Sequence, residues 1–427
     1  GSAMLAIILD KTSNLFYSER NKLNLQKESA MLAIILAPFY LLINYYVVRW
    51  MIRWTGTCHR HLKSRPFRAV FLCIYIFMCL TPLTSYLISV NPWHSWLKRL
   101  FNYWLGTFLY IVLIIIIFDI IRIILKHTNW IKNETLARRR TFILSGGAAA
   151  CLIICLSAYG IIHEHRLYVN HYEARVEKSG GKLDHLRIAL TADLHLGYSI
   201  GTYHVKSMVD KINAENVDLV CIAGDFFDNE YDAVQYPEKT ISILKNLKST
   251  YGVYACWGNH DFKEKLLAGF TVPVKNGQHT DARMDNFLEQ AGIRLLDDKS
   301  VLIDDSFYLA GRKDPQRSKK MKEDRLSPDE LLKDLDPNKP ILVIDHQPKQ
   351  LQELADAGCA IDLSGHTHDG QMFPGNLTTK LMWENSWGEL KKDNMYSYVT
   401  SGVGVWGPAM RVGTDAEIMI IDVYFTK

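Results

Sequence analysis

Hydrophobic positions gather in the first half of the chain, where they form four apolar stretches. These stretches cover residues 31–48, 70–90, 105–125 and 141–162. Each is close to the ~20 residues that a helix needs to cross the apolar core of a bilayer. Four buried helices of a large soluble core are the alternative. The grouping of the stretches in one block, with basic segments between them, favours a four-helix transmembrane domain.

The basic residues of this block predict its orientation. Residues 31–163 contain 14 Lys or Arg and two acidic residues, and the first and third connectors hold most of the basic ones. By the positive-inside rule, these two connectors face the cytoplasm. The fourth helix then leads residues 164–427 to the extracytoplasmic side of a multi-pass cell-membrane protein. The opposite orientation would place them in the cytosol.

Small residues in the fourth stretch predict close helix packing. Gly146 and Gly147 are followed by three alanines, and small side chains allow helices in lipid to approach closely.

Residues 1–30 are set apart from this domain. Residues 2–9 read SAMLAIIL, residues 29–36 repeat that sequence, and the first two residues resemble a cloning scar. We therefore interpret residues 1–30 as a tail that is partly foreign or duplicated, and exclude it from fold reasoning.

Composition separates the two halves further. The chain of 427 residues is 48% hydrophobic, with a net charge of +4 and a mean hydropathy of −0.03. These values exclude a disordered chain. The net charge of the whole chain hides a difference between its halves, because residues 164–427 hold 31 basic and 40 acidic residues and are therefore net acidic. An acidic half argues against nucleic acid as a partner, since binding to a phosphate backbone needs a basic face.

Short β-rich runs and helical patterns alternate from Leu186 onward. We expect strands at 186–191, 219–223, 252–257, 307–310, 341–345, 361–364, 396–400 and 418–423. Helices are expected at 205–215, 237–247, 281–290, 328–334 and 348–357. Strands that alternate with helices indicate a layered α/β domain. The predicted organisation is a tail (1–30), a four-helix transmembrane domain (31–163) and an α/β domain (164–427).

Residues that can bind metals recur where the predicted strands end. The segments are Asp193-Leu-His195, Gly224-Asp225-Phe-Phe-Asp228, Gly258-Asn259-His260-Asp261, His346 and Gly365-His366-Thr-His368. Side chains at the ends of parallel strands meet at one rim, where ligands bind. The preceding glycines allow tight turns. Imidazole, carboxylate and amide donors without thiolate suit Mn, Fe or Zn.

This series of motifs resembles the calcineurin-like metallophosphoesterase family over residues 186–425. The family series D-x-H, G-D-x-x-D, G-N-H-[DE], H and G-H-x-H is complete. The resemblance is greatest to the membrane-anchored branch, which includes bacterial multi-pass proteins and an animal transmembrane protein with this domain. Asp369 replaces the glycine that is usual in the bacterial branch, and is expected to alter a turn or a substrate contact. The late stretch through Arg411 also resembles this branch, and Arg411 is a second candidate for substrate contact.

The resemblance implies a four-layer α/β/β/α sandwich with two divalent metal ions, Mn²⁺ first and Fe or Zn as alternatives. One ion would be held by Asp193, His195, Asp225 and His368, and the other by Asp225, Asn259, His346 and His366. Asp225 would bridge the two. Metal-bound hydroxide would attack phosphorus, and His260 would be the general acid, oriented by Asp261. Asp228 is expected to support the ligands without binding metal.

The segment between the last metal motif and the next strand, residues 372–395, contains Trp383 and Trp387. Long loops beside active sites often bind ligands, so we expect these tryptophans to contact the bilayer or an acyl chain; packing on the sandwich is the alternative. The sequence therefore favours an integral-membrane hydrolase of phosphoester or pyrophosphate bonds, with a lipid or lipid-linked substrate. The alternatives are a tethered hydrolase of soluble esters, a non-catalytic phospholigand sensor, and a transporter with an accessory domain.

Overall fold

The computed structural model describes residues 35–88, 91–128, 130–267, 270–272 and 279–426. The predicted tail of residues 1–30 lies outside them. The described chain divides into two compact units. The helical unit holds the residues up to Phe101, then Phe108–Ile153 and Glu264–Gln278. The sandwich unit holds Asn102–Thr107, Ile154–Lys263 and His279–Lys427. The domain boundary that we drew after residue 163 stays a prediction.

All four apolar stretches are helices, as predicted. They are helix Ile35–Cys58, α2 (Arg65–Leu87), α3 (Trp93–Thr128) and α5 (Arg139–His163). Each is long and apolar enough to cross a membrane. Short elements complete this part of the chain: η1 (Arg60–Lys63), α4 (Asn133–Ala137) and the antiparallel hairpin of β5 (Lys265–Leu267) and β6 (Phe270–Val272).

Close contacts between helices, together with hydrogen bonds between them, hold the helical unit together. A Cβ atom on Gly146 would lie 2.1 Å from Cδ1 of Trp54, so only glycine fits there. The Trp54 indole donates a hydrogen bond of 3.2 Å to the carbonyl of Ile143. The Tyr75 hydroxyl donates to Oδ1 of the buried Asn44 at 2.9 Å. Polar groups satisfied inside a bundle are what a lipid environment requires, because hydrocarbon offers no partner.

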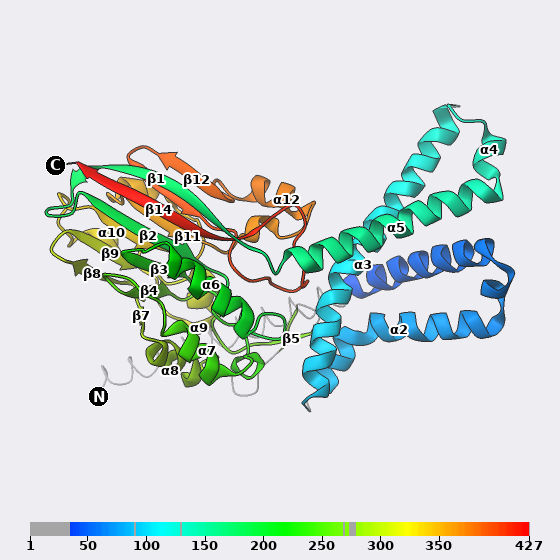
Figure 1. Cartoon of the computed structure of the whole chain (residues 1–427), viewed down its shortest axis with the longest axis horizontal. Coiled ribbons are helices and arrows are strands. Elements are labelled where there is room, and N and C mark those ends of the chain that lie inside the picture. The colour runs from blue at the N-terminus through cyan, green and yellow to red at the C-terminus, as the bar shows by residue number, and fades with distance from the viewer. Residues whose placement is uncertain (1–34, 89–90, 129, 268–269, 273–278, 427) are drawn as a thin grey trace, which may run out of the picture. The chain divides into compact units, whose positions relative to one another are not determined.

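Two six-stranded sheets form the centre of the sandwich unit (Figure 1). The first has the order β1-β14-β2-β3-β4-β7 and the second β12-β13-β11-β10-β9-β8. The first sheet consists of β1 (Leu167–Ser179), β2 (His185–Thr191), β3 (Leu219–Ala223), β4 (Val253–Cys256), β7 (Ile293–Leu295) and β14 (Ala416–Thr426). The second consists of β8 (Lys299–Ile303), β9 (Phe307–Gly311), β10 (Ile341–Ile344), β11 (Ile361–Ser364), β12 (Gly388–Lys392) and β13 (Met395–Val399). All eight expected strands are present.

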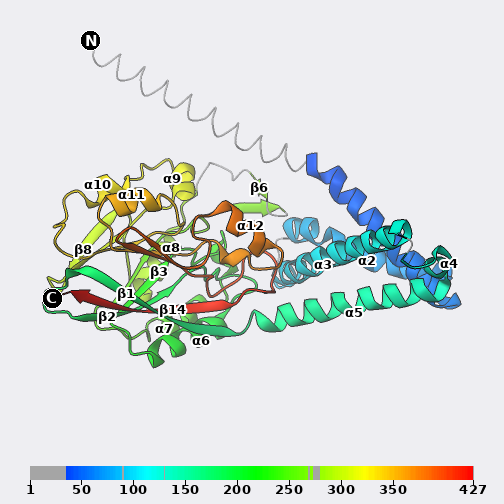
Figure 2. The same cartoon turned by 90° about the horizontal axis from the view of Figure 1, so that it is seen from above.

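Helices cover the outer face of each sheet. One apolar core, with Ile188, Leu309 and Leu363 among its residues, lies between the sheets. The first sheet packs on α6 (Thr202–Ala214), α7 (Pro237–Leu244) and α8 (Ala282–Ala291), and the second on α10 (Pro328–Leu332) and α11 (Leu351–Asp356). Figure 2 shows α6 and α7 on one side of the strands and α10 and α11 on the other. The predicted α/β/β/α layers are therefore confirmed.

Strand direction brings the metal motifs to one edge. Strands β2, β3 and β4 are parallel neighbours in the first sheet. Strands β10 and β11 are parallel neighbours in the second. The carboxyl ends of parallel neighbours lie together, and each of these five strands is followed directly by one of the motifs. Remaining connections contain η2 (Tyr231–Ala233), α9 (Pro315–Met321), η4 (His368–Gly370) and α12 (Gly375–Met382).

Candidate metal centre

Four of the predicted ligands meet around the ring of His346. Its Nε2 lies 2.9 Å from Oδ1 of Asn259 and 3.2 Å from Oδ2 of Asp225. Nδ1 of His366 lies 3.1 Å from the same nitrogen. Asp225, His346 and His366 form one of the three groups with metal-binding geometry among the described residues.

The remaining predicted ligands form a second cluster beside the first. Nε2 of His195 lies 3.1 Å from Nε2 of His368, which lies 3.7 Å from Oδ1 of Asp193. Oδ2 of Asp225 is also 3.7 Å from Nε2 of His195. This oxygen therefore reaches ring nitrogens of both clusters, as a bridging ligand must. The structure brings all seven predicted ligands together.

The backbone at this edge is held in an unfavourable conformation. Positive φ angles occur at Asp193, His195, Asp225, His366 and His368. Left-handed conformations cost energy in non-glycine residues and persist where the surrounding structure imposes them, often at functional sites. There is also no room for a side chain at Gly258, because a Cβ atom there would lie 2.1 Å from Oδ1 of Asp225. The turn after β4 thus requires glycine.

Hydrogen bonds to the backbone orient the ligands. Nδ1 of His346 donates to the carbonyl of Ala223 at 2.8 Å, which leaves the Nε2 lone pair facing the cluster. Oδ1 of Asp225 accepts from the N–H of His260 at 2.7 Å, so its Oδ2 remains available. Oδ2 of Asp193 accepts from the N–H of His366 at 2.9 Å. Such outer contacts fix which atom of each ligand can reach a metal.

Unpartnered polar atoms show that the centre fits divalent cations. Oδ1 of Asp193 is buried without a hydrogen-bond partner among the described residues, and Nε2 of His195 faces Nε2 of His368 at 3.1 Å. Burial raises the pKa of Asp193 to about 7 and lowers the pKa of His195 to about 3. Burial opposes ionisation of Asp225 as well, but the rings of His346 and His260 outweigh it and hold its pKa well below the usual range. Two cations would supply the charge and the coordination that these groups lack.

The predicted general acid, His260, has a different partner from the one expected. Its Nδ1 lies 2.5 Å from Oδ1 of Asn229. Asp261 instead accepts hydrogen bonds from the N–H groups of Asp225 and Gly258, both at 2.8 Å. Asp261 therefore braces the turns that carry the ligands, and Asn229 orients the ring. The sequence analysis missed Asn229 because the motif series ends at the preceding residue, Asp228.

Arg411, predicted to contact substrate, is fully buried. Its Nη2 donates to the carbonyls of Ser401 and Gly404 at 2.6 and 2.8 Å, and its Nη1 donates to the carbonyl of Asp415 at 2.9 Å. The N–H of Gly404 in turn donates to the carbonyl of Asp193 at 2.9 Å. The described hydrogen bonds of Arg411 thus come from its two Nη atoms, while Nε has no partner among the described residues, so contact with substrate stays a prediction. Arg411 supports the loop beneath a metal ligand.

We predict that Arg411→Met lowers the free energy of unfolding by about 3 kcal/mol or more, because each buried carbonyl left without a donor costs about 1–3 kcal/mol. Thermal unfolding of the purified chain measures this. Arg294→Met is the matched control, since Arg294 is exposed and donates to the hydroxyl of Tyr254. Unchanged stability of Arg411→Met, together with weaker substrate binding, would instead favour direct contact of Arg411 with substrate.

Three other predicted residues have clear positions. Asp228 places Oδ1 4.0 Å from Nδ1 of His195, beside a ligand. Asp369 is buried in η4 with a φ of 48°, which explains why glycine is suited to this position. Burial raises the pKa of Asp369 to about 6. Trp383 lies with its ring centroid 5.2 Å from that of His366.

Trp387 and α12 occupy the segment that was expected to contact lipid. The Trp387 indole donates to the buried Glu417 at 2.7 Å, while 44% of the residue is exposed. None of the residues of α12 is buried. Leu377, Leu381 and Met382 of this helix are 51, 89 and 75% exposed. The most exposed apolar surface of the segment is therefore α12, rather than the two tryptophans.

A two-sheet sandwich with paired metal-ligand clusters at the carboxyl ends of its strands is consistent with a metallophosphoesterase fold. Residues 186–370 match the family model for the calcineurin-like phosphoesterases.

Relatives have the same kind of domain. A metallophosphoesterase of uncharacterized function from Helicobacter pylori (strain J99) is 32% identical over 56% of this chain and 60% of its own length. The transmembrane protein with metallophosphoesterase domain from Danio rerio is 25% identical over 84% of this chain and 81% of its own. An uncharacterized metallophosphoesterase from Aquifex aeolicus is 28% identical over 64% and 97%. The chain thus covers less than two thirds of the length of the Helicobacter relative.

Proposed function

We propose that this chain is an integral-membrane, two-metal phosphoesterase that hydrolyses phosphoester or pyrophosphate bonds of a lipid or lipid-linked substrate. The observation that carries the catalytic part is the position of Asp225 Oδ2, 3.2 Å from His346 and 3.7 Å from His195. One carboxylate oxygen between two sets of nitrogen donors suits two cations about 3.5–4 Å apart, the spacing of two-metal hydrolases.

The two cations, Mn²⁺ in our proposal with Fe or Zn as alternatives, would activate water and stabilise charge on the phosphoryl oxygens. The residues of the chain then have separate tasks. Asp225, His346 and the other five ligands hold and orient the cations. His260 holds a proton for the leaving oxygen, and Asn229 Oδ1 accepts from Nδ1 so that Nε2 points to substrate. Partial exposure of His260 is consistent with access for a substrate.

Two features support a lipid substrate. The four helices are more than a tether requires, since one would anchor a soluble enzyme. Helix α12 also begins beside η4, the segment that starts at the predicted ligand His368. The two are in close contact, since a Cβ atom added to Gly370 of η4 would lie only 2.2 Å from the backbone of Gly375, the first residue of α12. The exposed Leu381 and Met382 at the other end of α12 are suited to an acyl chain. The proposed partners are therefore the bilayer and a phosphorylated lipid, and not nucleic acid.

Incubation with a total lipid extract tests the proposal. Wild-type protein is expected to release phosphate or a phosphomonoester and to change particular lipid species, while Asp225→Asn is expected to change none. Hydrolysis of soluble phosphoesters without any change in the lipids would leave the catalytic claim intact and refute the lipid claim.

The double variant Leu381→Ser and Met382→Ser should distinguish lipid from soluble substrates. Burial of a Leu or Met side chain contributes about 1.5–3 kcal/mol, so activity on vesicle-borne lipid should fall at least about tenfold, while hydrolysis of a soluble aryl phosphate stays unchanged. Leu326→Ser, at another exposed leucine, is the control. Equal losses on both substrates would refute acyl contact by α12.

The extracytoplasmic position of the sandwich is a further part of the proposal. Its support is the excess of basic residues in the first and third connectors. Protease added to intact cells is expected to cleave the sandwich unit and leave the helices behind. Full protection in intact cells, with cleavage after lysis, would indicate the opposite orientation.

A further inference from the structure

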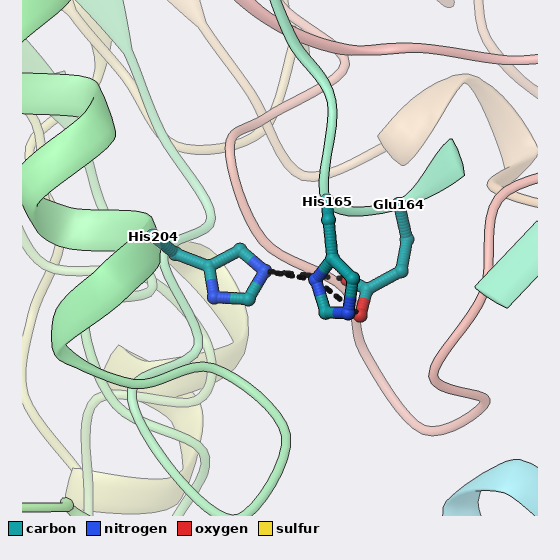
Figure 3. Close-up of side chains that lie close together, drawn as sticks. All are labelled: Glu164, His165 and His204. Atoms are coloured by element: carbon teal, nitrogen blue, oxygen red, sulfur yellow. Dashed lines mark hydrogen bonds and ion pairs between the residues drawn. The ribbon is translucent and has the colours of Figure 1, made fainter. Parts of the chain in front are cut away.

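A third group of metal-binding side chains lies outside the centre described above. Glu164 and His165 follow the end of α5, and His204 lies in the first turn of α6, 39 positions beyond His165. Nδ1 of His165 lies 3.0 Å from Nε2 of His204. Oε1 of Glu164 is 3.1 Å from Nδ1 of His165, and Oε2 is 3.6 Å from Nε2 of His204. Figure 3 shows the carboxylate and the two rings turned toward one another.

The carboxylate of Glu164 has too few partners for a buried anion. Glu164 is 2% exposed, and within the part of the chain that the structure describes neither carboxylate oxygen accepts a hydrogen bond. A buried charge without hydrogen bonds is costly. The charge of Glu164 acts on Arg411, but the hydrogen bonds described for that guanidinium go to backbone carbonyls. The neighbouring His163 points its Nε2 to Asp415 at 2.7 Å and so belongs to a separate pair.

The two facing ring nitrogens present a second deficit. Two neutral imidazole nitrogens at 3.0 Å share at most one proton. With the two oxygens of Glu164, three acceptor sites then surround that single proton. A cation at this point would satisfy all of them at once, and two imidazoles with one carboxylate are a common donor set for zinc.

We infer that Glu164, His165 and His204 bind a third divalent cation, separate from the two at the phosphoesterase centre. Imidazole donors favour the transition metals, zinc first. Three protein ligands leave a fourth position for water, and His165 is exposed enough for a cation to enter. Bound there, the cation ties the segment between α5 and β1 to the first turn of α6. A ligand that binds only the folded chain raises its stability.

Metal content of the purified full-length chain tests this inference. The protein is stripped with chelator, dialysed against Zn²⁺ and analysed for zinc per chain. Glu164→Gln and His165→Asn are each expected to bind one equivalent less than wild type and to lose part of the Zn²⁺-dependent rise in thermal unfolding midpoint. His171→Asn is the matched control, because His171 of β1 is similarly exposed and also lies beside a glutamate, Glu215.

The outcomes separate this site from the phosphoesterase centre. Asp225→Asn should lose zinc from that centre and keep the equivalent held by Glu164, whereas His165→Asn should keep basal hydrolysis. Equal zinc content in wild type, Glu164→Gln and His165→Asn would overturn the inference and leave two histidines beside a carboxylate without a metal. His165→Asn decides the matter if Glu164→Gln does not fold, because the exposed His165 tolerates a polar replacement.

Discussion

Replacing Asp225 with asparagine is expected to reduce hydrolysis at least about 10³-fold, because the two cations supply several kcal/mol of transition-state stabilisation and each 1.4 kcal/mol is tenfold in rate. The substitution keeps the side-chain volume and the acceptor for the N–H of His260, and removes the charge that lies between the two clusters. Metal content per chain and kcat/KM for an aryl phosphate are the measurements.

Asp232→Asn is the matched control for this loss. It removes the same charge from an exposed carboxylate that pairs with Arg283. The account expects the control to retain its metals and its activity. If Asp225→Asn retained two metals per chain and nearly full activity, Asp225 would not be the bridging ligand, and the pairing of the clusters would need another explanation.

His260→Ala is the second variant with a large expected effect. Loss of a general acid typically costs about 10²–10⁴-fold in rate. The loss should be greatest for substrates with a poor leaving group and small for nitrophenyl esters, whose leaving oxygen needs little protonation. Metal content should not change, because His260 is outside both ligand clusters. Rates over a series of leaving groups, compared with the metal content, measure both effects.

This variant also tests the class of function. A protein that only senses a phosphorylated ligand would bind that ligand equally well without His260. Equal losses over all leaving groups would indicate that His260 has a structural role. His279→Ala provides a control, because the ring of His279 lies near the carbonyl of Lys263 and belongs to neither ligand cluster.

Local patterns were sufficient to predict the strands that carry the ligands. The runs at 219–223 and 361–364 are short and each is followed directly by a glycine, so pattern and structure agree on their bounds. The convergence of His195 with Asp225 followed from the parallel order of β2 and β3, which the alternation with helices already implied. The approach of His366 to Asp193 depends instead on how the two sheets pack. Helices α6 and α11, each of which buries one face, were likewise visible as helical patterns between these strands.

Features that depend on distant contacts were not predictable. Strand β1 alternates charged and apolar residues, and its pairing with β14 connects Leu167 to Ala416 across the domain. Arg411 is polar in sequence but is buried because distant carbonyls gather around it. Glu164 and His204 belong to segments with no shared motif, so only the fold brings them together. In each case a long-range contact decides the role, and no local pattern encodes it.

Hydrolysis by the metal-reconstituted chain decides whether the sandwich unit is a metal-dependent phosphoesterase. The purified chain is stripped of metal and assayed on aryl phosphate and aryl phosphodiester substrates before and after addition of Mn²⁺ or Zn²⁺. We expect no turnover by the stripped protein, recovery with metal, and no recovery in Asp225→Asn. Absence of hydrolysis of both substrates, in protein that has taken up its metals, would refute the phosphoesterase activity.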